Sequence, residues 1–276
     1  MAGPDVAGGR GARRLAGWSR RLARLVPLGP AREVRRLREL PPRTRTTTRL
    51  LGPTLRVVDP VSFLDQYEAI FERELYRFVP RRENPVILDC GANIGLLSIY
   101  WKRRHPGARI VAFEPDPELV EVLAANLAAT GSEDVEVVPR AVWTDEGELD
   151  FWSEGSDGGR LLWDASDSRP ANCRVRTVRL RDSLTGATDM LKLDIEGAEV
   201  DVLLDCADRL EQVSHVFVEY HSFHAREQRL DELLQVLRRA GFRTQILPEV
   251  ASSQPFVGRP EHLGMDLQLN IFGYRT

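Results

Sequence analysis

Two short polar segments follow apolar runs in the second half of the chain. Asp194 and Glu196 lie two residues apart at the end of one run, and Glu219 and His221 repeat this spacing after the next. Residues two apart on a strand face the same side of a sheet. If the two runs are neighbouring strands, three carboxylates and an imidazole meet at one sheet edge, where they can remove a proton or bind a metal ion.

These side chains predict activation of a hydroxyl group in one of two ways. In the first, His221 or Asp194 accepts the proton directly. In the second, Asp194 and Glu219, with or without Glu196, bind a divalent cation such as Mg²⁺, which lowers the pKa of the hydroxyl. Simpler interpretations exist for Glu196 and for Glu199, an acid three residues further on. Glu196 can cap the following helix, and Glu199 lies in the first turn of that helix, where a carboxylate suits the helix dipole.

A glycine-containing turn follows an earlier apolar run, from Asp89 through Gly91 and Asn93 to Gly95. A dinucleotide-binding fingerprint has a glycine where this chain has Asn93. The carboxylate of Asp89 would repel a pyrophosphate but attract a sulfonium or an ammonium group. Glu114 ends the next apolar run, where a carboxylate can accept hydrogen bonds from both ribose hydroxyls. The turn therefore favours S-adenosylmethionine over NAD, with turn and cap chemistry as the simpler alternative.

The elements that position these residues alternate between strand and helix. β-branched apolar runs predict strands over 86–90, 109–113, 135–138, 189–194, 215–220, 242–247 and 267–274, with two extra strands over 148–152 and 174–180. Apolar residues at helical spacing predict helices over 61–79, 95–105, 116–130, 198–210 and 227–240. This alternation predicts an α/β fold with a doubly wound, mostly parallel sheet that binds ligands at the carboxyl ends of its strands.

Composition limits the other classes of protein. The chain has 276 residues and 42% hydrophobic residues, with no apolar run of the roughly 18 residues that a membrane span needs. Its three cysteines form no disulfide pattern, so we expect a reducing, cytoplasmic environment. The net charge of −3 divides into +10 over residues 1–50 and −13 over the rest. An acidic body argues against a nucleic-acid partner.

The same patterns predict three regions. Residues 1–50 form an Arg-rich arm, partly disordered, in which 13–26 have the pattern of a basic amphipathic helix. The arm can pack on the acidic body, on a second copy of the chain, or on a membrane or another partner. Residues 51–85 form a helical lid, and 86–276 form the core. The glycine-rich polar stretch 153–172 is either a mobile lid over a substrate or a solvated loop.

Four segments resemble the FkbM-type S-adenosylmethionine-dependent methyltransferases. They are 86–98 (VILDCGANIGLLS), 112–117 (AFEPDP), 191–199 (LKLDIEGAE) and 218–221 (VEYH). The third is the most specific, since many methyltransferases share a motif like the first. The resemblance extends from about residue 65 to 275 and leaves out the arm.

The resemblance implies a Rossmann-like class I methyltransferase with a seven-stranded sheet and an antiparallel last strand. It implies that the methionine part of S-adenosylmethionine is held by Asp89, Gly91, Asn93 and Gly95. Glu114 would then hold the ribose, and Asp116 and Ala141 would lie near the adenine. The family's reaction is methyl transfer, typically to oxygen, often in secondary-metabolite or saccharide pathways.

The sequence therefore predicts an O-methyltransferase that acts on a small hydroxylated metabolite, in a bacterial, cytoplasmic setting. Three alternatives stay open at this point: N-methylation of a small amine, an NAD-dependent oxidoreductase on the same fold, and a binding module without activity. The metal requirement and the oligomeric state are open as well.

Overall fold

A computed structural model describes residues 29–153, 155, 158–162, 170–258 and 264–275. The predicted basic helix over 13–26 lies outside the described residues, as does half of the predicted loop over 153–172. Within the described parts, no helix has the length and apolar character that crossing a membrane requires.

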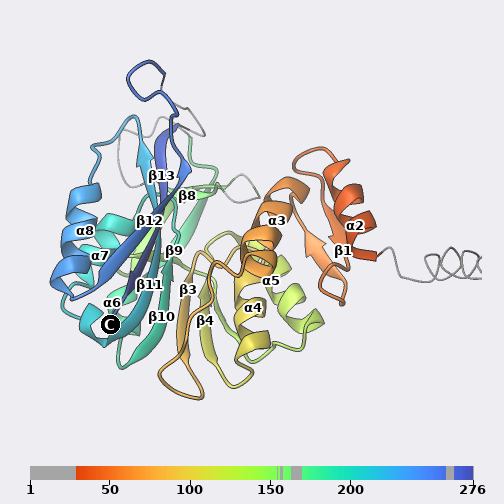
Figure 1. Cartoon of the computed structure of the whole chain (residues 1–276), viewed down its shortest axis with the longest axis horizontal. Helices are drawn as coiled ribbons and strands as arrows, with labels where there is room; N and C mark the ends of the chain where they lie inside the picture. The colour runs from red at the N-terminus through yellow and green to blue at the C-terminus, as the bar shows by residue number, and fades with distance from the viewer. Residues whose placement is uncertain (1–28, 154, 156–157, 163–169, 259–263, 276) are drawn as a thin grey trace, which may run out of the picture.

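A seven-stranded sheet forms the centre of the molecule, in the order β12-β13-β11-β10-β3-β4-β5 (Figure 1). All neighbours pair in parallel except β13, which is antiparallel to both β11 and β12. The predicted sheet with an antiparallel last strand is confirmed. Its strands are β3 (Val86–Cys90), β4 (Arg109–Phe113), β5 (Glu136–Val138), β10 (Thr188–Leu193), β11 (Val213–Phe223), β12 (Arg243–Val250) and β13 (Met265–Tyr274).

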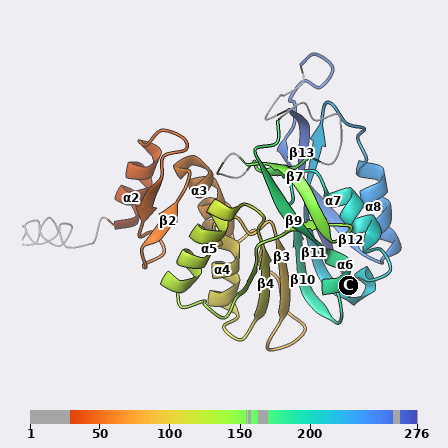
Figure 2. The same cartoon turned by 180° about the vertical axis from the view of Figure 1, so that it is seen from behind.

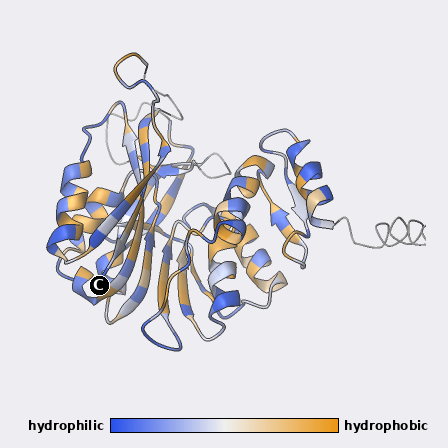
Figure 3. Ribbon diagram, in the orientation of Figure 1, coloured by the Kyte–Doolittle hydropathy of each residue, from blue (hydrophilic) through white to orange (hydrophobic). Residues whose placement is uncertain are grey.

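Helices cover both faces of this sheet (Figures 1 and 2). One face bears α4 (Leu96–Arg104) and α5 (Pro117–Ala129), and the other bears α7 (Glu199–Asp205) and α8 (Leu230–Arg239). Strand β3 shows why two layers form, because Ile87 packs into the core on the α4 side while Leu88 packs on the α7 side. Figure 3 shows the resulting concentration of apolar residues along the central strands. Burial on both faces explains the continuous apolar runs in the sequence.

A smaller sheet in the order β6-β9-β7-β8 lies beside the carboxyl ends of the central strands. It contains β6 (Ala141–Trp143), β7 (Gly147–Trp152), β8 (Arg160–Leu161) and β9 (Cys173–Arg179), followed by the short helix α6 (Leu180–Ser183). The two extra predicted strands are thus β7 and β9, which pair antiparallel. The turn of 3-10 helix η2 (Leu210–Gln212) leads into β11.

The amino-terminal part of the described chain is folded. Helix α2 (Gly29–Arg38) precedes a hairpin of β1 (Thr46–Thr48) and β2 (Leu55–Val57). Leu37 and Leu55 are fully buried and join the core cluster on the α4 side. The predicted boundary between residues 50 and 51 falls inside this hairpin, so ordered structure extends across it.

The helix predicted over 61–79 is shorter than expected. Helix α3 (Pro60–Tyr67) is capped by the carboxylate of Asp59 and continues as a π-helical turn, η1 (Glu68–Glu72). Two residues later Glu74 takes a positive φ of 48°, which ends helical geometry. Tyr76 and Phe78 after it still pack inward, and the ring of Tyr76 lies 4.8 Å from that of Phe217, whereas Val79 is exposed. Helical spacing here reflected burial rather than a continuous helix.

Candidate functional site

A cavity of about 510 Å³ opens at the carboxyl ends of β3, β4, β10 and β11. One side, the glycine-turn half, is lined by Asp89, Gly91, Asn93, Glu114, Asp116 and Ala141. The other side, the acidic half, is lined by Asp194, Glu196, Glu219 and His221. Helices α3 and η1 close the cavity from above through Ser62, Ala69 and Ile70. Of the predicted site residues, Gly95 alone is not on its wall.

The glycine turn has a conformation that depends on its residue types. Gly91 has φ +83°, and a Cβ there would lie 1.8 Å from the carbonyl oxygen of Asp194. Asn93 takes a positive φ of 50°, and its side chain accepts a hydrogen bond from the Ile94 amide. Gly95 begins α4, where a Cβ would lie 2.6 Å from Leu123. Gly91 therefore joins the two halves of the cavity, whereas Gly95 lets helices α4 and α5 approach closely.

Glu114 is held in place entirely by backbone donors. Its Oε2 accepts a hydrogen bond from the Asn93 amide at 2.8 Å, and its Oε1 accepts one from the Asp116 amide at 3.0 Å. Burial raises the pKa of Glu114 to about 7, although these hydrogen bonds oppose the rise. Each oxygen keeps a further lone pair, so the carboxylate can accept two hydroxyl groups.

Asp116 and Ala141 line the same side. Asp116 caps α5 by accepting a hydrogen bond from the Glu118 amide at 2.9 Å, and its other oxygen accepts one from the Ser153 hydroxyl. Ala141 begins β6 and is buried. Asp116 thus caps α5, a role that the sequence analysis did not assign to it, and it also lies on the cavity wall.

Lys192 lines the cavity, although the sequence patterns assigned it no role. Its ammonium group lies on the cavity wall, where it donates to the carbonyl oxygen of Gly91 and lies 3.0 Å from Asp194. Asp89 is 3.9 Å away and fully buried, with one oxygen bound to Ser98 and the other without a hydrogen-bond partner. A lysine within a fully buried strand was the available signal, since such a group is rarely buried unless paired.

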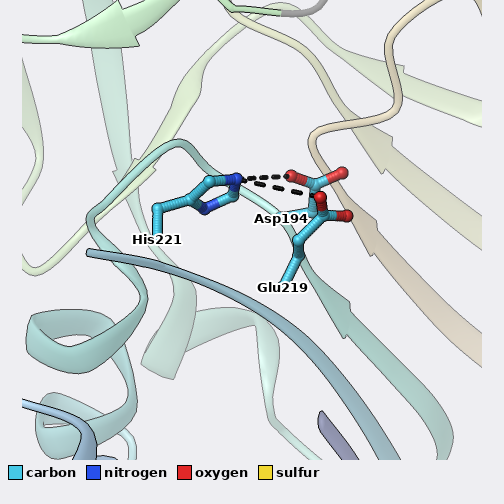
Figure 4. A group of neighbouring side chains, drawn as sticks. All are labelled: Asp194, Glu219 and His221. Atoms are coloured by element: carbon cyan, nitrogen blue, oxygen red, sulfur yellow. Dashed lines mark ion pairs between the residues drawn. The ribbon is translucent and has the colours of Figure 1, made fainter. Parts of the chain in front are cut away.

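The acidic half brings together the four residues predicted from the two strand ends, and Figure 4 shows three of them, Asp194, Glu219 and His221. Nε2 of His221 lies 3.8 Å from Glu196, 3.9 Å from Glu219 and 4.0 Å from Asp194. His221 and Glu219 come from β11, and Asp194 follows the neighbouring strand β10. The parallel pairing of these strands confirms that the side chains meet at one sheet edge.

Glu199 belongs to this group, although the sequence suggested only a helix-dipole role. It is fully buried, and its Oε1 accepts hydrogen bonds from His221 Nδ1 at 2.9 Å and from the amides of Ile195 and Gly197. A single carboxylate therefore fixes both the imidazole and the turn that carries Glu196, whose φ is +57°.

The electrostatics follow from burying several acids together. Burial, with a further contribution from the charge of Asp194, raises the pKa of Glu219 to about 7. Burial also raises the pKa of Glu196 well above its usual value. For His221 burial acts in the opposite direction, but the charges of Glu196 and Glu199 outweigh it and raise the pKa of the imidazole. The cluster thus attracts positive charge, whether a proton or another cation.

The strand order, the antiparallel β13 and the glycine turn that leads from β3 into α4 define a Rossmann-like class I methyltransferase. The Methyltransferase FkbM domain matches residues 89–244, and the chain belongs to this family of S-adenosylmethionine-dependent methyltransferases. The family resemblance predicted from the four motifs is confirmed.

Three curated relatives illustrate the match. The chain is 33% identical over 228 residues to the AMB antimetabolite synthetase AmbE of Pseudomonas aeruginosa, covering 65% of this chain and 10% of that protein. It is 28% identical over 158 residues to the 2-O-methyltransferase NoeI of Sinorhizobium fredii, covering 50% and 64%. It is 39% identical over 62 residues to the 31-O-demethyl-FK506 methyltransferase FkbM of Streptomyces tacrolimicus, covering 22% and 24%. The chain thus spans less than two thirds of each relative.

The glycine-turn half fits S-adenosylmethionine chemically. The buried oxygen of Asp89 that has no partner suits the ammonium group of the methionine part. Glu114 offers two acceptor oxygens to a ribose, and the positive φ of Gly91 and Asn93 exposes backbone to a ligand. A pyrophosphate would meet the Asp89 and Glu114 carboxylates, which explains why this turn differs from a dinucleotide site.

Proposed function

We propose that this protein transfers a methyl group from S-adenosylmethionine to a hydroxyl oxygen of a small metabolite. One observation carries the proposal: a single cavity joins the Glu114 cradle to the cluster of Asp194, Glu196, Glu219 and His221. An oxygen nucleophile must lose a proton, and this cluster provides several groups that accept one. Two of the relatives are named as O-methyltransferases, which agrees with this choice.

The residues of this chain divide the task between the two halves. Asp89, Glu114 and the Gly91 turn hold the methyl donor, which supplies an electrophilic methyl group on sulfur. The acidic half orients the acceptor hydroxyl and takes its proton, while the oxygen forms the new bond to carbon and the sulfur keeps the electrons of the broken bond. Gly91 lies against the Asp194 carbonyl, so a fixed backbone contact sets the distance between donor and acceptor.

The cavity supports a small-molecule substrate, and the cysteines support a cytoplasmic site of action. The cavity is enclosed by α3, η1 and β13, with the size of a typical small-molecule site. The three cysteines are free thiols, and two of them are buried, as expected in a reducing compartment. The predicted Arg-rich arm and any contact between copies stay predictions.

Calorimetry with S-adenosylhomocysteine tests the donor site, and NAD serves as the control ligand. We expect binding of S-adenosylhomocysteine and none of NAD, and the reverse result would overturn the proposal. Methyl transfer is then measured on matched hydroxyl and amine acceptors with isotopically labelled donor.

The variant Asp194→Asn separates oxygen from nitrogen as the methyl acceptor. We expect it to lower turnover on a hydroxyl about 100-fold, because general base catalysis contributes about that much. A neutral amine needs no base before attack, so an N-methyltransferase would lose little. Equal turnover of wild type and variant would therefore contradict O-methylation.

A further inference from the structure

The acidic half contains a buried imidazole whose Nε2 faces three carboxylates at ion-pair distance but forms no hydrogen bond with them. His221 is 5% exposed, and its Nδ1 is bound to Glu199. Nε2 makes no hydrogen bond with a residue in the described part of the chain; its three nearest carboxylates lie at 3.8–4.0 Å. These separations are too long for hydrogen bonds and leave room for an atom between the groups.

We propose that Asp194, Glu219 and His221 bind a first-row divalent transition-metal ion, which orients the acceptor hydroxyl. This inference rests on the proposed function and identifies how the same site handles its acceptor. One ligand atom from each residue lies within 4.8 Å of the other two. Ligands bonded to one cation at about 2.1 Å lie at most about 4.2 Å apart, so a contraction of well under 1 Å completes the site.

Each of the three ligands is oriented by a second residue behind it. Glu199 accepts from Nδ1 of His221, which directs the lone pair of Nε2 into the cluster. The Gln268 amide donates to Glu219 Oε1, which places that oxygen beside Nε2. Such outer partners accompany metal-binding imidazoles and carboxylates and raise their affinity.

Lys192 orients the third ligand and does not occupy the metal position. It lies 3.0 Å from Oδ2 of Asp194, whereas the other oxygen, Oδ1, faces His221. One oxygen of Asp194 is therefore committed to the lysine and the other to the cluster. The ammonium offsets one of the four carboxylates of Asp194, Glu196, Glu199 and Glu219, so the cluster remains negative enough for a divalent cation.

The donor atoms decide which cation is expected. The sequence suggested Mg²⁺ on Asp194 and Glu219, and Mg²⁺ prefers oxygen ligands alone. The imidazole of His221 adds a nitrogen ligand, which favours first-row transition metals over Mg²⁺. When bound, such an ion acts as a Lewis acid that lowers the pKa of a coordinated hydroxyl. Glu196, beside the three ligands, is then available to accept the proton.

Binding of Mn²⁺ to protein dialysed against a chelator tests the site without depending on activity. The electron paramagnetic resonance signal of free Mn²⁺ falls when the ion binds, so the titration gives both affinity and stoichiometry. We expect one Mn²⁺ per chain and only weak competition by Mg²⁺. The matched control is His224→Ala, which alters an exposed histidine 3.9 Å from Asp266 and should bind Mn²⁺ as wild type does.

Three variants of the site complete the experiment. His221→Leu and Glu219→Gln should abolish stoichiometric binding, and two such variants guard against one that fails to fold. Glu199→Gln should weaken binding about 10- to 100-fold, because it alters only the outer partner. Absence of stoichiometric Mn²⁺ binding by wild type, or equal binding by wild type and His221→Leu, overturns the inference.

Failure of the metal inference can be distinguished from failure of the proposed function. If S-adenosylhomocysteine binds and methyl transfer proceeds in the presence of chelator, the metal inference fails while O-methylation by a direct base stands. If S-adenosylhomocysteine does not bind, the proposed function itself fails, whatever the result with Mn²⁺.

Discussion

The two halves of the cavity are built from different parts of the polypeptide. In the glycine-turn half, the backbone amides of Asn93 and Asp116 hold Glu114, although Asp89 is bound by the side chain of Ser98. In the acidic half, side chains hold one another, as Glu199, Lys192 and Gln268 do for three neighbours. Local backbone conformation therefore positions Glu114 in the glycine-turn half, and strand register brings the side chains of the acidic half together.

The contact between the halves gives the largest expected effect. Gly91→Ala places a methyl group 1.8 Å from the Asp194 carbonyl oxygen in a backbone with φ +83°. Neither backbone can move alone, so we expect the free energy of unfolding to fall by about 4 kcal/mol and S-adenosylhomocysteine binding to be lost. Urea unfolding and calorimetry measure both. Gly186→Ala, with open space around it, is the control and should change neither.

Within the acidic half, Glu199→Ala should lower the free energy of unfolding by about 3 kcal/mol. The change leaves His221 Nδ1 and the amides of Ile195 and Gly197 buried without their acceptor. Asp201→Ala removes another acid from the first turn of α7, but one that is partly exposed and paired with Arg229. Its cost should stay below about 1 kcal/mol. If both variants lose a similar free energy of unfolding, Glu199 acts only through the helix dipole.

Glu114 in the glycine-turn half should make the free energy of unfolding depend on pH. Its pKa is about 7 in the folded protein and near 4.5 when exposed, so the folded state binds more protons between these values. The ligand-free protein should lose roughly 2–3 kcal/mol of stability from this group as the pH rises from 4.5 to 7. The difference between wild type and Glu114→Gln, followed by urea unfolding across this range, isolates the effect from Glu219. A pH-independent difference would contradict it.

The same carboxylate should make donor binding depend on pH in the opposite direction. Ribose hydroxyls donate to the ionised form, so the affinity for S-adenosylhomocysteine should increase as the pH rises towards 7. Calorimetry in buffers of different ionisation enthalpy should detect release of a proton below that pH. Glu114→Gln should bind about tenfold more weakly and release none.

The smallest effect is expected at the cap of α5. Asp116→Ala should reduce the free energy of unfolding by about 1 kcal/mol, because the Glu118 amide loses its acceptor. Asp116→Asn keeps a good cap and should differ from wild type by less than about 0.5 kcal/mol. If the asparagine variant is as unstable as the alanine variant, the negative charge rather than the cap stabilises this turn.

The difference between local contacts in the glycine-turn half and long-range contacts in the acidic half explains what the sequence could predict. The run 86–90 identified β3 to the residue, and the following turn identified most of the donor site, because both depend on residues close together in the chain. Asp194 and Glu219 were also found, since parallel strands place their ends together. Lys192 was given no role and Glu199 only a helix-dipole role, because each also binds a partner distant in the chain, Gly91 for Lys192 and His221 for Glu199. The helix over 61–79 was overextended because Tyr76 and Phe78 pack against the core without being helical, whereas Val79 is exposed.

The position of β13 affects how the protein is made. This strand lies between β11 and β12, both of which precede it in the chain, and it contributes Gln268 beside Glu219. During synthesis, β3 to β5 can associate as soon as they leave the ribosome, but β12 has no neighbour until β13 arrives. Contacts between residues distant in the chain form slowly. The acidic half, which includes the Gln268 contact to Glu219, is therefore complete only when β13 has been inserted between β11 and β12.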